Sequence, residues 1–421
     1  MRWKRRNFAS SLILRWLWPA TVIILAACSP TPKQPNPSSE VQPLVIVPGL
    51  EQARVNHKLP AGVTLEEERN GLIVPRSWQF RSERLDHPGL AELRLRERLD
   101  EVIAPGRDEF EKMVLLCDWV NSQWKNSNPI PYPPWDANLI LSMIRSGQTG
   151  GFCAQYAVVL GQSLLSLGWQ ARYLDIAPEG GKPGSGHFTV EAWSNQHNQW
   201  MVLDPFYDCW FEKDKKPLSA LQIHEALISG QKNSVRVVRG KGKNAFGNSN
   251  ASDEQIITAY FSLGADMRND HLSRPFQFWD RRDTYLAWQD AAAKEEKSVY
   301  LNFSADPLEF SFPLNQVQVR LTGGNAPDML VCWARTNTPE LETLELKFND
   351  GPWTRPASPF DQSQGSMLRT ALTPLYGAVI VFDWKLAPGD NRVYVRGVNR
   401  RGIAGPASFF SVNYQAGKSS P

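Results

Sequence analysis

The chain has 421 residues and a formal net charge of +3, because 46 Lys and Arg are nearly balanced by 43 Asp and Glu. A chain of this length has room for two or three domains, each with its own core. No run of five or more basic residues occurs, so the charge pattern gives no support to a nucleic-acid partner.

The first 27 residues are typical of an export signal. A basic start at residues 2–6 is followed by an uncharged apolar run from Trp16 to Ala27, which is too short to remain as a membrane-spanning helix. The end of this run, Leu25-Ala26-Ala27-Cys28, resembles the bacterial lipoprotein signal, in which the cysteine is acylated and becomes the first residue after cleavage. The resemblance implies lipidation of Cys28 and an exported protein anchored in the cell envelope. Because Ser29 follows, it also implies the outer membrane in a Gram-negative host.

Residues 28–58 are rich in Pro, Ser and Gln, and this composition predicts a flexible tether. From residue 59 onward we expect a folded domain that begins with a short extended region. A charged helix is expected over 90–102, and a second helix is expected to begin near Asp108 with Cys117 on its apolar face.

Residues 129–135 read Pro-Ile-Pro-Tyr-Pro-Pro-Trp, which fits neither a helix nor a central strand. The segment is expected to be a rigid extended loop. Because the helix expected over 136–145 leads directly to a glycine pair, the loop either borders an active-site cleft or is a plain connector.

The glycine pair Gly150-Gly151 precedes Cys153, and Cys153 opens a third helix. Apolar residues recur from Ala157 to Leu167 at helical spacing, and Gly168 provides a C-terminal stop. Cys153 is therefore expected in the first turn, where unpaired backbone N–H groups and the helix dipole favour a thiolate. The glycines are interpreted as giving a substrate access to the backbone.

Two polar residues downstream of Cys153 are candidates to act with it in catalysis. His187 and Asp204 lie on two expected strands joined by a hairpin loop at 195–198. If Ser194 pairs with His197, His187 faces Asp204 directly; if Ser194 pairs with Gln199, Asp204 becomes its diagonal neighbour on the same face. Either register gives a nucleophile, a base and an orienting carboxylate.

These residues resemble the transglutaminase-like superfamily, which carries Gly-x-Cys at a helix start, a His opening a strand, and an Asp ending the next strand before Pro. The resemblance covers roughly 110–205. It implies that Cys153 is the nucleophile, His187 the general base and acid, and Asp204 the residue that holds the imidazole. The resemblance also makes Trp119 and Trp124 candidates for support of the oxyanion, with core packing as the alternative.

The resemblance implies an α+β fold in which helices pack on an antiparallel sheet, here over residues 59–299 with a helical extension at 212–300. Short alternating strands from residue 300 onward predict a β-sandwich over 300–421, similar to fibronectin-III and immunoglobulin-like modules. Free thiols are expected, with Cys209 as the best candidate for any disulfide. The absence of Cys-x-x-Cys and His-x-x-x-His pairs gives no reason to expect a metal or another cofactor.

The first interpretation of function is a membrane-anchored thiol enzyme that cleaves peptide or protein amide bonds through an acyl-enzyme, with hydrolysis favoured over transfer to an amine. The alternative is a binding or scaffold lipoprotein whose transglutaminase-like core has lost activity. Expected partners are a peptide or protein substrate, the membrane through the N-terminal lipid, and a cell-envelope partner or glycan for the C-terminal module.

Overall fold

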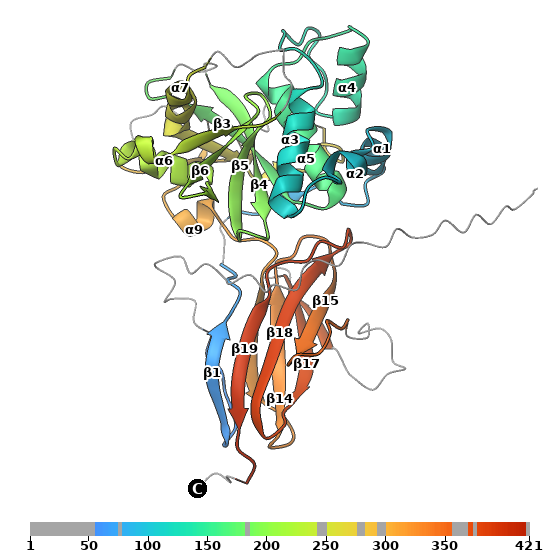
Figure 1. The fold of residues 1–421 in the computed structure, drawn as a ribbon, viewed down its shortest axis with the longest axis vertical. Helices are drawn as coiled ribbons and strands as arrows, with labels where there is room; N and C mark the ends of the chain where they lie inside the picture. Colours follow the sequence, from blue (N-terminus) through green and yellow to red (C-terminus); the bar gives the residue numbers. More distant parts are fainter. Residues whose placement is uncertain are drawn as a thin grey trace, which may run out of the picture. The chain divides into compact units, whose positions relative to one another are not determined.

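The computed structural model describes residues 55–74, 78–181, 186–241, 251–275, 283–292, 300–355, 369–373 and 377–417. The expected signal peptide, Cys28 and nearly all of the tether lie outside these ranges. Within them, no helix has the length and apolar character needed to cross a bilayer. The chain forms a mixed helix and sheet domain, here called the mixed domain, and a β-sandwich (Figure 1).

A nine-stranded sheet forms the centre of the mixed domain. Its strands follow the order β12-β11-β9-β3-β4-β5-β6-β7, and β8 pairs with β6. Neighbouring strands of this sheet pair antiparallel, except that β11 and β12 are parallel. The strand bounds are β3 (Ala171–Ala177), β4 (His187–Ser194), β5 (Gln199–Asp204), β6 (Cys209–Lys213), β7 (Lys216–Pro217), β8 (Arg236–Arg239), β9 (Ser262–Asp266), β11 (Tyr285–Trp288) and β12 (Asn302–Ser304).

Helices cover both faces of this sheet. One core joins α3, α4 and α5 to β3, β4 and β5, and a second core joins the opposite face to α6 and α7. The helices are α1 (Pro88–Arg96), α2 (Leu99–Ile103), α3 (Glu109–Asn121), α4 (Ala137–Arg145), α5 (Cys153–Leu167), α6 (Ala220–Ile228), α7 (Asp253–Thr258) and the short α9 (Pro307–Phe310).

The central helix is α5, which is buried on all sides beyond its first residue. It ends at Gly168, whose φ of 100° lies in the left-handed region that glycine adopts without strain. The helices before it begin as expected: the Asp108 side chain accepts the N–H of Glu111, and the Asp136 side chain caps α4. The helix expected over 90–102 is instead divided into α1 and α2 at Arg98, whose φ is 53°.

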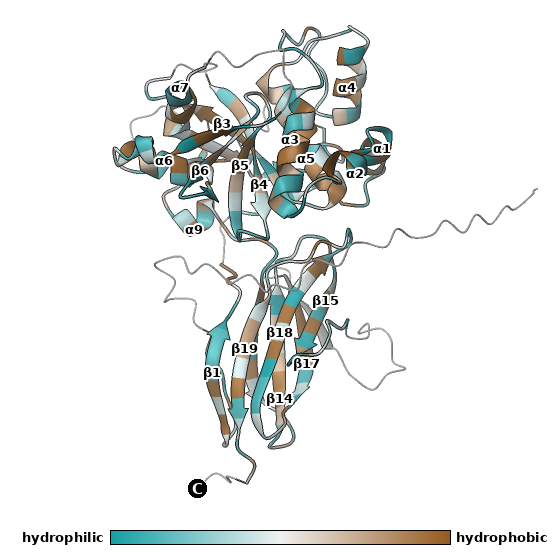
Figure 2. Cartoon of the chain, viewed as in Figure 1, coloured by the Kyte–Doolittle hydropathy of each residue, from teal (hydrophilic) through white to brown (hydrophobic). Residues whose placement is uncertain are grey.

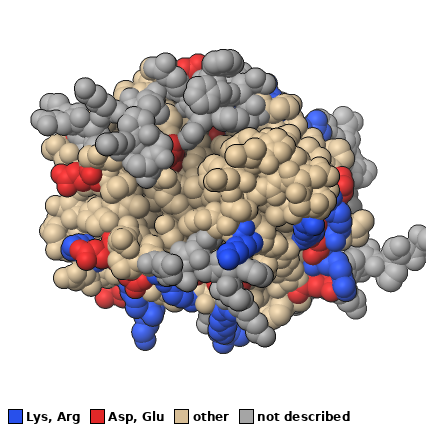
Figure 3. Space-filling model, turned by 90° about the horizontal axis from the view of Figure 1, so that it is seen from above, with Lys and Arg blue, Asp and Glu red and all other residues tan. Residues whose placement is uncertain are grey.

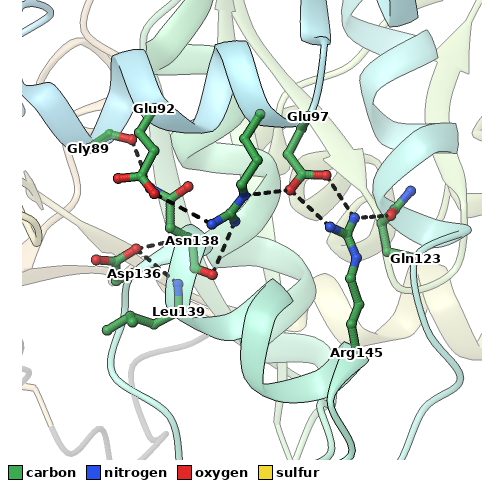
Figure 4. Close-up of polar contacts among 9 residues, drawn as sticks. Gly89, Glu92, Glu97, Gln123, Asp136, Asn138, Leu139 and Arg145 are labelled. Carbon is green, nitrogen blue, oxygen red and sulfur yellow. Dashed lines mark hydrogen bonds and ion pairs between the residues drawn. The ribbon is translucent and has the colours of Figure 1, made fainter.

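An ion pair and a hydrogen bond connect the end of α4 to the residues that follow α1 and α3 (Figure 4). The Arg145 guanidinium donates to both oxygens of Glu97, at 2.9 and 2.7 Å, and to the Gln123 side chain at 2.6 Å. The Glu97 side chain is only 6% exposed and also accepts from Arg96 at 3.0 Å. Because α4 leads into the segment before Cys153, this contact helps to fix where that segment begins.

The sandwich consists of two four-stranded sheets in the orders β1-β19-β18-β15 and β13-β14-β17-β16. Their strands alternate between polar and apolar residues (Figure 2), and the apolar side chains of both sheets form one core that includes Cys332. The bounds are β1 (Val63–Arg69), β13 (Val317–Gly323), β14 (Met329–Thr336), β15 (Leu341–Phe348), β16 (Arg369–Thr373), β17 (Gly377–Lys385), β18 (Gly389–Asn399) and β19 (Ser408–Tyr414).

Three features differ from the expectations for domain organisation. Strand β1 precedes the mixed domain in sequence yet pairs with β19 of the sandwich, and β12 lies in the nine-stranded sheet although it follows residue 300. Residues 212–300, expected to be mostly helix and loop, also contribute strands β7, β8, β9 and β11 and the short β10 (Arg268–Asn269). Several of these strands have only two to five residues, too few for alternation to identify them or their partners.

Polar contacts connect the sandwich to the mixed domain at two places. The Asn399 amide donates to the Gly168 carbonyl at 2.8 Å, directly at the end of α5. On the hairpin between β4 and β5, Asn195 accepts from Asn315 at 2.8 Å and Asn198 accepts from Gln316 at 2.7 Å. The sandwich therefore contacts both the helix that begins with Cys153 and the hairpin that carries His187.

Candidate active site

The structure brings Cys153, His187 and Asp204 together. Cys153 is the first residue of α5, His187 the first of β4, and Asp204 the last of β5. The His187 Nε2 atom lies 2.6 Å from Asp204 Oδ2, and a hydrogen bond joins the Cys153 and His187 side chains. The hairpin pairs Ser194 with Gln199, which is the second of the two expected registers.

Asp204 is fully buried and is fixed by its own backbone turn. Its Oδ1 atom accepts the N–H groups of Phe206 and Tyr207, each at 3.0 Å. Asn121 on α3 holds the same turn by donating to the Pro205 carbonyl at 2.9 Å. Because Oδ1 is occupied by the turn, Oδ2 remains directed at His187.

Two aromatic rings flank the imidazole of His187. The ring centroids of Phe206 and Tyr207 lie 5.3 and 4.8 Å from that of His187. Since a carboxylate only accepts hydrogen bonds, Nε2 donates to Asp204 and the second ring nitrogen, Nδ1, is left for Cys153. The sequence analysis did not identify Phe206 and Tyr207; the only signal for them is their place directly after Asp204 and Pro205.

His187 is held in its protonated form. Burial by itself lowers the pKa of the imidazole, but the charge and hydrogen bond of Asp204, together with the contact to Cys153, outweigh burial and raise the pKa to about 10. At neutral pH the imidazole therefore carries a proton beside the thiol, and it is positioned to donate that proton to a leaving group.

The start of α5 places Cys153 where helix geometry leaves backbone N–H groups without partners inside the helix. Phe152 is the residue before the first turn, and its own N–H is accepted by the Gln155 side chain at 3.1 Å. Cys153 is partly exposed, whereas Cys117, Cys209 and Cys332 are buried, and all four are free thiols. Burial raises the pKa of the Cys117 and Cys209 thiols well above the ordinary value.

The glycines before Cys153 are explained by protein packing, which corrects the expectation of substrate access. A Cβ on Gly150 would lie 2.4 Å from the Asn128 carbonyl oxygen, and one on Gly151 would lie 2.7 Å from the Trp124 indole nitrogen. The segment that carries the glycines is therefore pressed against the loop after α3, and a larger residue at either position would displace it.

Trp124 holds this segment in place. Its indole N–H donates to the Gly151 carbonyl at 3.2 Å, and its ring stacks on Tyr156 at a centroid distance of 4.1 Å. Trp119 is partly buried against the same core. These contacts account for Trp124 as a packing residue, while support of the oxyanion by either tryptophan stays a prediction.

The proline-rich loop at 129–135 lies against the residues that precede Cys153. The Thr149 hydroxyl donates to the Pro131 carbonyl at 2.6 Å, and the rings of Tyr132 and Phe152 meet edge-on at 6.2 Å. Of the two interpretations left open by the sequence, these contacts favour a loop that borders the site.

The described residues contain no cluster of three or more His, Cys, Asp or Glu side chains arranged to hold a metal ion. The arrangement that they do contain is a thiol, an imidazole and a carboxylate in one hydrogen-bonded series, which is suited to nucleophilic attack on an acyl group.

Comparison with known proteins identifies one family. Residues 96–205 match the model of the transglutaminase-like superfamily, and the matched range contains Cys153, His187 and Asp204. The resemblance and the fold class stated from the sequence are thereby confirmed. A comparison with curated proteins gives no significant match.

Proposed function

Because residues 96–205 form a domain of the transglutaminase-like superfamily, we propose that the protein is a cysteine-dependent enzyme that acts on peptide or protein amide bonds through an acyl-enzyme. The observation that carries the proposal is the series from Cys153 through His187 to Asp204, in which Asp204 lies 2.6 Å from the imidazole. A protein that uses this core only as a scaffold has no need for this series.

The reaction begins with a thiolate at Cys153 and an imidazolium at His187. The sulfur attacks the amide carbonyl, and the backbone N–H of Cys153 at the helix start stabilises the oxyanion. His187 donates its Nδ1 proton to the nitrogen of the leaving amine, and the C–N bond breaks to leave a thioester. Asp204 keeps the imidazole oriented and stabilises its positive charge.

The second half of the reaction regenerates the enzyme. His187, now neutral, takes a proton from water as the water oxygen attacks the thioester, and collapse of the intermediate releases the acid and the Cys153 thiolate. An amine in place of water gives transfer instead of hydrolysis. Hydrolysis is favoured in the proposal because water is always present as an acceptor.

The test uses the full chain in detergent with a library of peptide amides, and it measures release of the amine by mass spectrometry. Cys153→Ala is expected to abolish release, whereas Cys332→Ala, in the core of the sandwich, serves as the matched cysteine control. No release by the wild type from any substrate, or equal release by Cys153→Ala, would contradict the proposal.

We further propose that the enzyme is exported and anchored by a lipid on Cys28, which rests on residues 1–29 of the sequence. Envelope peptides and proteins are then the accessible substrates. Cys28→Ser is expected to shift the protein from the membrane fraction to the soluble fraction. A variant that stays in the membrane fraction would contradict the lipid anchor.

For the sandwich we propose a role in binding a cell-envelope glycan. Its support is a pair of partly exposed rings beside the sheet that contains β18, Tyr394 and Trp353, whose centroids lie 6.4 Å apart. Arg396 lies 4.0 Å from the centroid of Trp353. Aromatic faces of this kind suit sugar rings, and Trp353→Ala is expected to reduce retention on insoluble envelope glycan.

A further inference from the structure

Two of the exposed large hydrophobic side chains lie on the loop beside the nucleophile. Ile130 is 77% exposed and Tyr132 is 49% exposed. An isolated exposed apolar residue needs no explanation, but these two share one short loop, and the ring of Tyr132 contacts that of Phe152. Phe152 is partly buried and directly precedes Cys153.

The loop presents these side chains from a fixed backbone. Four prolines between 129 and 134 restrict its φ angles. Ser127 donates its N–H to the Gly151 carbonyl at 3.0 Å, and the Trp135 indole donates to the Tyr132 hydroxyl at 3.1 Å. A preorganised apolar surface loses little conformational freedom when a ligand binds.

The two segments that carry this surface contain no charged residue. Neither residues 126–135 nor residues 146–156 contain a Lys, Arg, Asp or Glu. Figure 3 looks onto the side of the molecule that carries α4 and α7, and a broad area of it has no charged side chain. The two segments therefore offer no charged partner to a substrate side chain, while Ile130 and Tyr132 offer exposed apolar surface.

We propose that Ile130, Tyr132 and Phe152 form a subsite for an aliphatic or aromatic side chain of the substrate. Consecutive Cα atoms are about 3.8 Å apart, so a side chain on Phe152 is within reach of a substrate residue next to the amide that Cys153 attacks. The inference rests on the proposed function and adds a substrate class to it: peptides with an apolar residue within about two positions of the scissile amide.

The experiment compares two alkylating probes on the full chain in detergent. The second-order rate constant for modification of Cys153 is measured by mass spectrometry with N-benzyl iodoacetamide and with iodoacetamide. The rate constant for the benzyl probe is divided by that for iodoacetamide. This ratio is then divided by the same ratio measured for glutathione, which has no subsite, to give the normalised ratio. The wild type is expected to exceed glutathione by about tenfold, the factor expected when roughly a third of the benzyl surface is removed from water.

Two variants test the residues. Ile130→Ser is expected to reduce the normalised ratio to about threefold or less, and Ile130→Thr, which keeps the branched shape, is expected to give an intermediate ratio. The matched control is Leu95→Ser on α1, where an apolar side chain is 81% exposed, and its ratio is expected to equal that of the wild type. A wild-type ratio equal to that of glutathione, or an Ile130→Ser ratio equal to that of Leu95→Ser, would overturn the subsite.

The same assay separates the subsite from the proposed function. One outcome is that His187→Ala slows alkylation of Cys153 by iodoacetamide while the wild type shows no preference for the benzyl probe. This outcome supports the proposed thiol enzyme and contradicts the subsite. If His187→Ala has no effect while the benzyl preference persists and depends on Ile130, the apolar site stands as a binding site and the catalytic proposal fails.

Discussion

Asp204 holds His187 with one carboxylate oxygen and its own backbone turn with the other. The 2.6 Å contact to His187 Nε2 uses Oδ2, while Oδ1 accepts two backbone N–H groups. The orientation of the imidazole is thus set by a carboxylate that the backbone at the end of β5 holds in place.

Asp204→Asn is expected to reduce kcat by about 10³- to 10⁴-fold, because an amide stabilises neither the correct tautomer nor the imidazolium. The negative charge of Asp204 is the main factor that raises the pKa of His187 to about 10. Without that charge the imidazolium loses its proton at lower pH. The alkaline limb of the kcat/KM profile should therefore move to lower pH, and a limb at an unchanged pH would contradict this electrostatic role.

His187→Ala is expected to slow alkylation of Cys153 by iodoacetamide at pH 6 by more than about tenfold, because the variant lacks the positive charge beside the sulfur. The buried thiols of Cys117 and Cys209 provide the internal reference, since they should react only after unfolding. Mass spectrometry of the modified peptides measures the rates separately. Equal rates for wild type and variant at Cys153 would show that the imidazole does not activate the thiol.

Local sequence signals predicted the elements that carry Cys153, His187 and Asp204 well. The start of α5 at Cys153, its stop at Gly168 and the hairpin between His187 and Asp204 all follow from periodicity and turn composition over a few residues. The two hairpin registers differed only in which residues faced each other, and the structure selects the pairing of Ser194 with Gln199.

Local sequence signals could not predict which strands pair when they lie far apart in the sequence. The sequence of β1 is compatible with any neighbouring strand, and its pairing with β19 depends on contacts across more than 300 residues. The roles of Gly150 and Gly151 depend on Asn128 and Trp124, which approach only in the folded chain. A glycine signals that space is needed, but the sequence does not say whether protein or substrate fills that space.

Glu109→Gln is expected to flatten the dependence of stability on pH. Burial raises the pKa of Glu109 to about 7 from an ordinary value of 4.5, although hydrogen bonds from Asn195 oppose the shift. Between these two values the folded chain keeps a proton that the unfolded chain has released. Wild-type stability should therefore decrease as pH rises from 4.5 to 7, by at most about 1.4 kcal/mol per pH unit from this group.

The measurement for Glu109 is the urea midpoint at pH 5 and at pH 7.5 for the wild type, Glu109→Gln and the exposed control Glu66→Gln. Other groups titrate in the same pH range. The quantity to compare is therefore the difference between the urea midpoints at pH 5 and pH 7.5, which should be smaller for Glu109→Gln than for the wild type and for Glu66→Gln. A Glu109→Gln protein with the same pH dependence as Glu66→Gln would contradict a raised pKa at the partly buried Glu109.

Arg145→Ala is expected to destabilise the mixed domain by about 1–3 kcal/mol, because Glu97, only 6% exposed in its side chain, would lose a bidentate charged partner. The comparison is Arg107→Ala, which removes an ion pair to Glu111 from a side chain that is 85% exposed and should cost much less stability, because water screens an exposed ion pair. Since Arg145 ends the helix that leads to Cys153, its loss should also lower kcat, whereas loss of Arg107 should not. Urea unfolding and single-turnover kinetics measure the two effects, and equal losses for both variants would show that the Glu97 ion pair has no special role in holding the segment before the nucleophile.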